Sequence, residues 1–212
     1  MADFCYPTLG GMILKAALTG DLPYRDEIEK ARLFDDGSDP FFISESWQIR
    51  DDFVRTHSFA IPCQEAISAI IGGGSAPILE VGAGTGLWAK FIADYGGRVV
   101  ATDPTIAGNL SPYSQRVGRY YPVETLQADE AVKAYPDHDL LSVWPCLYAD
   151  WIVEAARVLK PGRRIILVGE LHGASNNPAL VEFLTERCDL QRQLSIPTFD
   201  MLHDCLYIWR VR

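Results

Sequence analysis

The hydrophobic positions of this chain change their spacing along its length. From residue 77 onward, short apolar runs alternate with segments in which apolar residues recur at helical spacing. The runs predict strands near 77–81, 98–102, 122–127, 139–143, 164–168, 189–195 and 204–211. The segments between them predict helices near 86–95, 147–159 and 178–188, a weaker helix near 129–134, and a loop over 105–121. This alternation predicts a parallel α/β sheet of the Rossmann-like, doubly wound kind.

The first part of the chain lies outside this alternation. Its pattern predicts short helices over Met12–Leu18 and Tyr24–Phe34, further helices within 46–71, and a flexible glycine hinge at 72–74. We therefore expect two parts. Residues 1–75 form an N-terminal helical cover segment, and residues 76–212 form the core.

The first predicted strand runs directly into a glycine turn. Residues 78–86 read Ile-Leu-Glu-Val-Gly-Ala-Gly-Thr-Gly. Glycine lets the backbone approach a ligand closely, and the helix that follows points its unpaired N–H groups at the turn. Dinucleotide-binding folds prefer G-x-G-x-x-G, but Leu87 stands where the last glycine would be. Glu80 would repel a pyrophosphate and suits a ligand with an ammonium or sulfonium group, which favours S-adenosylmethionine over NAD.

A second acidic residue follows the next predicted strand. Asp103 lies about 20 residues beyond the turn, where a carboxylate can accept both ribose hydroxyls of a nucleoside. Asp129 follows the third predicted strand and could accept a hydrogen bond from an adenine amino group. An acid at the start of a helix is equally common as a cap, so both interpretations of Asp129 stay open.

Composition narrows the classes of partner. The formal net charge is −9 and the chain has no basic cluster beyond Arg163–Arg164, which argues against nucleic acid. No apolar run has the length of a membrane span, and we expect no secretory signal.

The five cysteines are dispersed, which is typical of reduced thiols and predicts a cytoplasmic location. The four histidines lack metal-ligand spacing, so we expect no metal site.

Several motifs together resemble those of class I S-adenosylmethionine-dependent methyltransferases. The stretch 78–86 resembles the first signature of that family, Asp103 its ribose acid, Ala128–Asp129 its adenine segment, and 157–165 the turn before its fifth strand. The resemblance implies a seven-stranded sheet whose last strand, 204–211, is antiparallel, and it implies S-adenosyl-L-methionine as cofactor. The expected cofactor-binding residues are Glu80, Gly82, Ala83, Gly84, Gly86, Asp103, Asp129 and Trp144.

The segment after the fourth predicted strand bears on the methyl acceptor. Residues 144–148 read Trp-Pro-Cys-Leu-Tyr and are similar to the Trp-Pro-Pro-Tyr motif of a group of uncharacterised methyltransferase-like proteins. Enzymes that methylate amino groups of DNA resemble [Asp/Asn]-Pro-Pro-aromatic here, and Trp144 lacks their acceptor oxygen. We therefore expect a small-molecule or protein acceptor. Trp144 would form an aromatic wall for it, or would simply pack in the core.

Chain topology predicts where the acceptor site lies. The ends of the fourth and fifth strands and the beginning of an antiparallel last strand meet at one edge of the sheet, so Trp144, Glu170 and His203–Asp204 should converge. Glu170 or His172 would position or deprotonate the acceptor, unless both only brace the following loop. A non-catalytic S-adenosylmethionine sensor or partner subunit is the alternative function, and the sequence leaves the oligomeric state open.

Overall fold

The structure, a computed structural model, describes residues 50, 53–54, 57–104, 119–173, 175–199 and 202–212. The helices predicted over Met12–Leu18 and Tyr24–Phe34 lie outside these residues, as does most of the loop predicted over 105–121. No helix within the described ranges combines the length and the apolar character that crossing a membrane requires.

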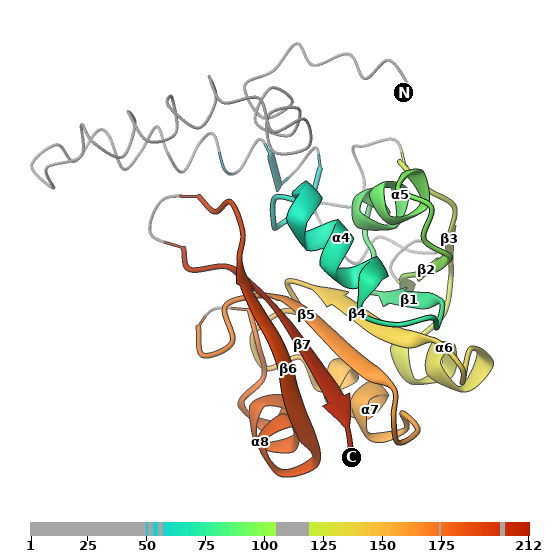
Figure 1. Ribbon diagram of the computed structural model, residues 1–212, viewed down its shortest axis with the longest axis vertical. Coiled ribbons are helices and arrows are strands. Elements are labelled where there is room, and N and C mark those ends of the chain that lie inside the picture. The colour runs from blue at the N-terminus through green and yellow to red at the C-terminus, as the bar shows by residue number, and fades with distance from the viewer. Residues whose placement is uncertain (1–49, 51–52, 55–56, 105–118, 174, 200–201) are drawn as a thin grey trace, which may run out of the picture.

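The described residues contain a seven-stranded sheet with the order β3-β2-β1-β4-β5-β7-β6 (Figure 1). Its strands are β1 (Ile78–Val81), β2 (Val99–Thr102), β3 (Val123–Glu124), β4 (Asp139–Val143), β5 (Arg164–Gly169), β6 (Cys188–Ser195) and β7 (Cys205–Val211). The pairs from β3 to β5 are all parallel, whereas β7 is antiparallel to both β5 and β6. The predicted Rossmann-like α/β fold, with its antiparallel last strand, is confirmed.

Two groups of helices cover the two faces of the sheet. The helices are α4 (Gln64–Gly72), α5 (Leu87–Asp94), α6 (Ala128–Ala134), α7 (Asp150–Arg157) and α8 (Pro178–Arg187). Apolar side chains of α4 and α5 form one core with Ile78 and Ile166, while those of α6, α7 and α8 form another with Leu79 and Ile165. Neighbouring strand residues therefore enter opposite cores, which explains why the central strands are apolar at successive positions.

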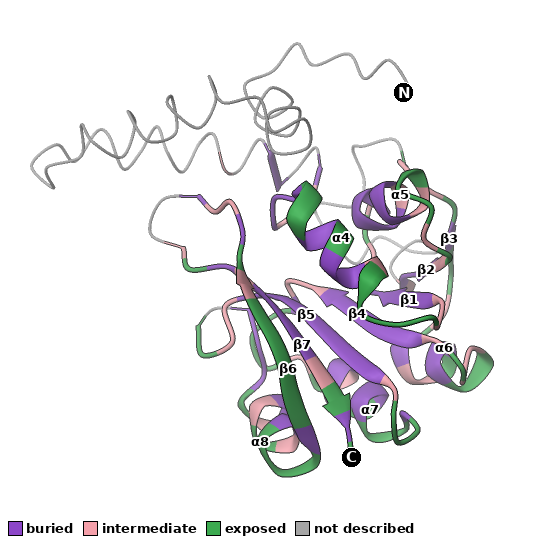
Figure 2. Cartoon of the chain, viewed as in Figure 1, coloured by how far each residue is buried: buried purple, intermediate pink, exposed green. Residues whose placement is uncertain are grey.

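Burial decreases from the centre of the sheet toward its edge strands. The central strands β1 and β5 are buried at every position, whereas β6 is exposed along most of its length (Figure 2). At the other edge β3 spans two residues, shorter than the predicted 122–127. The chain turns early there because α6 begins at Ala128, where the Glu130 carboxylate accepts the backbone N–H of Gln127 at 3.3 Å and so caps the helix.

The amino end of the sheet holds a buried ion pair. The Arg164 Nε lies 2.7 Å from Asp139 Oδ2, and both side chains are almost fully buried. The guanidinium packs over the glycine run predicted as a hinge: a Cβ on Gly73 would lie 2.3 Å from Arg164 Nη1. Close packing against Arg164 therefore explains the glycines at Gly73 and Gly74, whereas a Cβ on Gly72 would meet no atom within 4 Å in the part of the chain that the structure describes.

Candidate functional site

The glycine loop after β1 borders open space at the carboxyl edge of the sheet. Gly84 has a φ of +54°, and a Cβ there would meet no atom of the described residues within 4 Å. Gly86 has a φ of +73°, and a Cβ there would lie 3.0 Å from the Tyr121 side chain. Glycine is required at both positions by the left-handed backbone. Only at Gly84 is there also room above the backbone for a ligand.

Two carboxylates from adjacent strands brace this loop and the helix that follows it. Asp103, directly after β2, accepts the Gly84 N–H at 2.9 Å. Glu80, within β1, is 1% exposed and accepts the Ala89 N–H of α5 at 2.9 Å. The pKa of Glu80 is raised to about 8, chiefly by burial; the Ala89 hydrogen bond lowers it, and the negative charge of Asp103 contributes to the rise. A cationic group on a bound ligand would favour the ionised form of Glu80, and a further negative group would disfavour it.

Two other predicted cofactor residues make contacts within the chain. The backbone N–H of Ala83 donates to the Thr102 carbonyl at 3.0 Å, which ties the loop to β2. Asp129 lies in the first turn of α6, where its carboxylate pairs with Lys133 at 2.6 Å, and this hydrogen bond lowers its pKa. A contact between Asp129 and adenine stays a prediction.

A described part of the predicted cover segment lies across the same edge. We call residues 57–63 the edge segment. The His57 carbonyl accepts the Thr85 hydroxyl at 2.6 Å, and the Ala60 carbonyl accepts the Trp88 indole N–H at 3.3 Å. The His57 Nδ1 also lies 2.6 Å from the Tyr120 hydroxyl. The edge segment is thus tied to the glycine loop and to α5, and the division of the chain at residue 75 stays a prediction.

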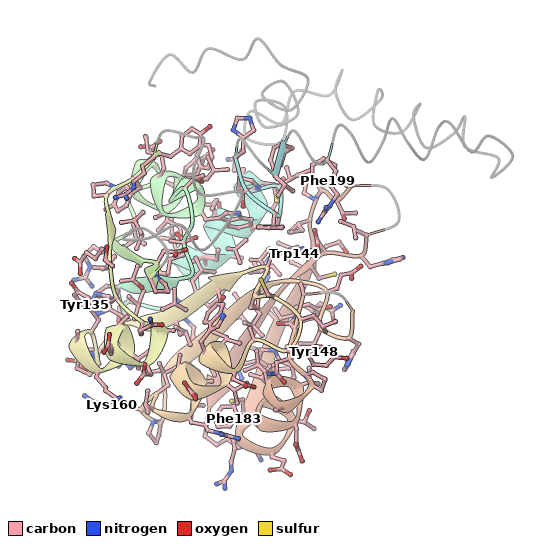
Figure 3. The ribbon with its side chains drawn as sticks, turned by 180° about the vertical axis from the view of Figure 1, so that it is seen from behind. Tyr135, Trp144, Tyr148, Lys160, Phe183 and Phe199 are labelled. Atoms are coloured by element: carbon pink, nitrogen blue, oxygen red, sulfur yellow. The ribbon has the colours of Figure 1, made fainter. Side chains whose placement is uncertain are left out.

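Trp144 stands at the centre of the carboxyl edge. It follows β4 with a φ of +52°, a left-handed conformation that costs an L-residue about 1–2 kcal/mol. Its indole stacks on Phe59 of the edge segment, with centroids 5.5 Å apart, and Arg50 Cζ lies 5.2 Å from the ring centroid. Figure 3 shows Trp144 and Phe199 toward one end of the molecule and Lys160 toward the other.

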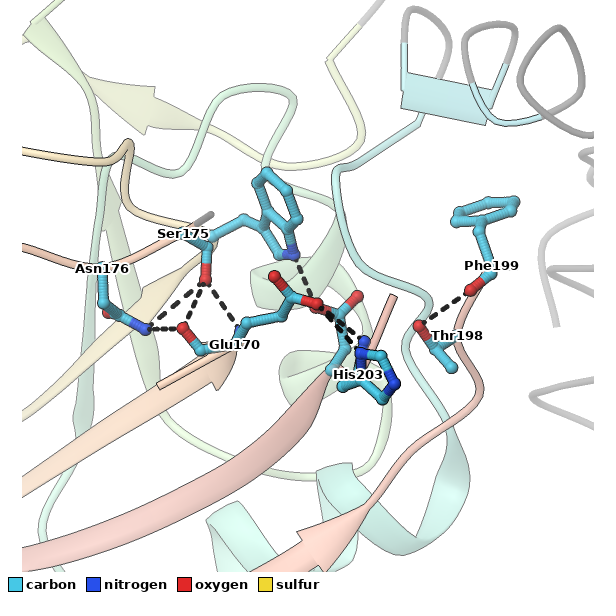
Figure 4. Close-up of polar contacts among 8 residues, drawn as sticks. Glu170, Ser175, Asn176, Thr198, Phe199 and His203 are labelled. Atoms are coloured by element: carbon cyan, nitrogen blue, oxygen red, sulfur yellow. Dashed lines mark hydrogen bonds and ion pairs between the residues drawn. The ribbon is translucent and has the colours of Figure 1, made fainter. Parts of the chain in front are cut away.

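The predicted convergence at this edge is present in the structure. The Trp144 Nε1 donates to Asp204 Oδ1 at 2.7 Å. The Glu170 carboxylate accepts the His203 backbone N–H at 2.9 Å (Figure 4). We call Trp144, Glu170, His203 and Asp204 the carboxyl-edge cluster. His172 lies in the exposed turn after β5, and no hydrogen bond or ion pair found among the described residues joins it to the cluster.

The backbone around Glu170 is held firmly. The Ser175 hydroxyl accepts the Glu170 N–H at 2.8 Å, and the Asn176 amide donates to the Glu170 carbonyl at 2.7 Å. These contacts brace the loop through the main chain of Glu170. They leave its carboxylate to contact His203, so bracing the loop and acting in the site are compatible for this residue.

The structure also reveals buried polar atoms at this edge whose lack of a hydrogen-bond partner no sequence pattern predicts. His57 is 8% exposed, and its Nε2 is buried without a hydrogen-bond partner among the described residues. Asp204 is 3% exposed, and its Oδ2 has no such partner either. Topology could place Asp204 at this edge, but no pattern in the sequence shows that one of its oxygens is left over.

No family model matches the chain, and no curated protein matches it. Among solved structures, it is similar to the 1,6-didemethyltoxoflavin-N1-methyltransferase of Burkholderia thailandensis, at 20% identity over 80% of this chain and 85% of that one, with a TM-score of 0.48. It is also similar to cofactor-bound Rv0187 from MTB, at 17% identity over 90% and 97% of the two chains, with a TM-score of 0.47. The N-methyltransferase NodS of Bradyrhizobium japonicum gives 14% identity over 94% and 97%, with a TM-score of 0.42. These values are too low to carry a functional argument.

Proposed function

We propose that this chain binds S-adenosyl-L-methionine and transfers its methyl group to a small-molecule or protein acceptor. The observation that carries the proposal is the pair of carboxylates, Glu80 and Asp103, on either side of a glycine loop that borders open space at Gly84. Burial raises the pKa of Glu80 to about 8, so a neighbouring cation would favour its charged form, whereas a pyrophosphate would oppose it.

The residues of this edge suit each part of the ligand. Asp103 would accept hydrogen bonds from the ribose hydroxyls, and Glu80 would orient the amino group, directly or through water. Gly82 and Gly84 would let the backbone pass beneath the methionine part. Asp129 would contact adenine, and Trp144 would lie near the methyl group. When bound, S-adenosylmethionine supplies a methyl group on a positively charged sulfur, so the protein mainly provides approach and orientation.

One observation favours a second candidate function, a non-catalytic S-adenosylmethionine-binding protein or partner subunit. The Trp144 ring is in contact with Phe59 and Arg50, so an acceptor would reach it only if these side chains moved or if it approached from the side of Asp204. The cofactor site does not depend on that access. Binding without turnover would therefore be the signature of this alternative.

The cofactor claim is tested by a thermal-shift panel with S-adenosylmethionine, S-adenosylhomocysteine, NAD and NADP on the full chain. We expect only the first two to raise the melting temperature, because a ligand that binds the folded state stabilises it. Stabilisation by NAD or NADP alone would refute the proposal. Transfer of a tritiated methyl group into cell extract then separates an enzyme from a binding protein.

A cytoplasmic location is also a proposal. Cys63, Cys146, Cys188 and Cys205 are all unpaired thiols among the described residues, as a reducing compartment would leave them.

A further inference from the structure

Asp204 is a buried carboxylate, and one of its two oxygens has no hydrogen-bond partner among the described residues. The residue immediately precedes β7, and its Oδ1 accepts the Trp144 indole N–H at 2.7 Å. The Oδ2 is buried and has no hydrogen-bond partner among the described residues. A buried polar oxygen without a partner carries a free-energy cost of about 1–3 kcal/mol, so its retention suggests that a ligand supplies the missing donor.

The backbone around Asp204 is built to hold it against Trp144. Gly169 pairs with Cys205 in the β5–β7 register, which places Asp204 beside the end of β5. Gly169 has a φ of +139°, and a Cβ there would lie 2.4 Å from Ser175 Oγ and 3.2 Å from Trp144 Cδ1. The left-handed backbone of Trp144 at the same point stores strain, which in proteins is concentrated at functional sites.

The charges that face Asp204 indicate the kind of ligand. Burial raises its pKa to about 6, the Trp144 hydrogen bond opposes this rise, and the negative charge of Glu170 adds to it. The positive charges of Arg50 and His203 lower the pKa, each less than Glu170 raises it. Two carboxylates beside aromatic rings attract an ammonium group and disfavour a phenolate or a carboxylate.

Resting on the function proposed above, we propose that the methyl acceptor is an amine and that Asp204 Oδ2 binds it and takes its proton. The ammonium form would bind at Oδ2 and lose one proton through it to water, which leaves a neutral amine whose N–H still donates to Oδ2. The lone pair of the amine would form the new N–C bond while the S–C bond breaks and leaves its electron pair on sulfur. The proton of the resulting ammonium would pass to the Asp204 carboxylate and from there to water, so that S-adenosylhomocysteine and an N-methylamine are the products.

The test uses the full chain, tritiated S-adenosylmethionine and a panel of matched probes. The amines are benzylamine, phenethylamine and tryptamine, and their counterparts are benzyl alcohol, 2-phenylethanol and tryptophol. We expect transfer to at least one amine and at least tenfold less to its alcohol. Asp204→Asn should lower that turnover by about 100-fold, the scale of acid–base help, with unchanged affinity for S-adenosylhomocysteine. Asp137→Asn, a change on an exposed side chain, is the matched control and should turn over like the parent.

A pH profile separates proton transfer from a merely structural role. In the parent, kcat/KM should fall below about pH 6 as Asp204 becomes protonated, and this acid limb should be absent from the residual activity of Asp204→Asn. Asp204→Ser serves if the asparagine variant does not fold. Preference for the alcohols, labelling of no amine, or full turnover in both variants would overturn the proposal. Failure of S-adenosylhomocysteine to bind the parent would instead refute the function on which it rests.

Discussion

Two buried aspartates at opposite ends of one sheet have different surroundings. At the amino end, Asp139 uses both oxygens within the chain: Oδ1 accepts the Arg164 backbone N–H at 2.9 Å and Oδ2 accepts its Nε at 2.7 Å. At the carboxyl end, Asp204 uses one oxygen, and the other is buried without a partner among the described residues. Their exposed fractions are the same, 3%.

Burial alone therefore does not separate a structural acid from a functional one. What separates them is whether the chain itself supplies all their hydrogen-bond partners. Where it does, the acid contributes to folding, and removing it leaves a buried cation unpaired. Where it does not, the acid adds little to stability, and a ligand is the natural source of the remaining donor.

The largest expected effect comes from making the same substitution at both ends. Asp139→Asn should lower the free energy of unfolding by about 3–5 kcal/mol, because the Arg164 charge would remain buried without its partner. Asp204→Asn keeps an oxygen for the Trp144 N–H and removes a buried charge, so we expect a change within about 1 kcal/mol. Urea denaturation measures both, and equal losses would break the comparison.

A second test concerns the glycines that pack on Arg164. Gly73→Ala should lower the free energy of unfolding by about 1–3 kcal/mol, since its Cβ would lie 2.3 Å from a guanidinium fixed by Asp139. Gly72→Ala, where nothing lies within 4 Å, is the matched control and should have a much smaller effect. If the two variants unfold at the same urea concentration, the packing described here does not constrain the glycine run.

The third test uses the pH dependence of stability at the carboxyl edge. Glu80 has a folded-state pKa of about 8 against an ordinary value of 4.5, so between these values the folded state holds a proton that the unfolded state has lost. Stability without ligand should therefore fall as pH rises from 6.5 to 8, by up to about 1.4 kcal/mol per pH unit. Glu80→Gln should flatten this slope, and an unchanged slope would assign the proton to another group.

The fold could be predicted well from the sequence, because the spacing of apolar residues and the residues that favour turns are local signals. The strands β1, β2, β4 and β5 and the helix α8 lie within a residue or two of their predicted bounds. Helix α7 begins at Asp150 and not near 147, because the segment from Trp144 to Tyr148 includes two residues with left-handed backbone. Such conformations in Trp and Tyr leave no signature in composition.

The site was predictable only in part. The glycine loop and its two acids follow from spacing, and topology predicted that Trp144, Glu170 and Asp204 meet. The pairing of Asp129 with Lys133 could also have been predicted, since the two lie four residues apart in a predicted helix. The exposed position of His172 depends on loop geometry that a sequence pattern does not specify. The lack of a partner for Asp204 Oδ2 likewise depends on three-dimensional contacts that a sequence pattern does not specify.

The most direct test of the central claim is isothermal titration calorimetry of the full chain with S-adenosylhomocysteine. We expect saturable binding at a single site, and Asp103→Ala should weaken it by about 1–3 kcal/mol, or roughly 5- to 150-fold in Kd. Asp137→Ala, far from the glycine loop at the opposite end of the sheet, should bind like the parent. Absence of binding by the folded parent, or equal affinity in Asp103→Ala, would contradict the account.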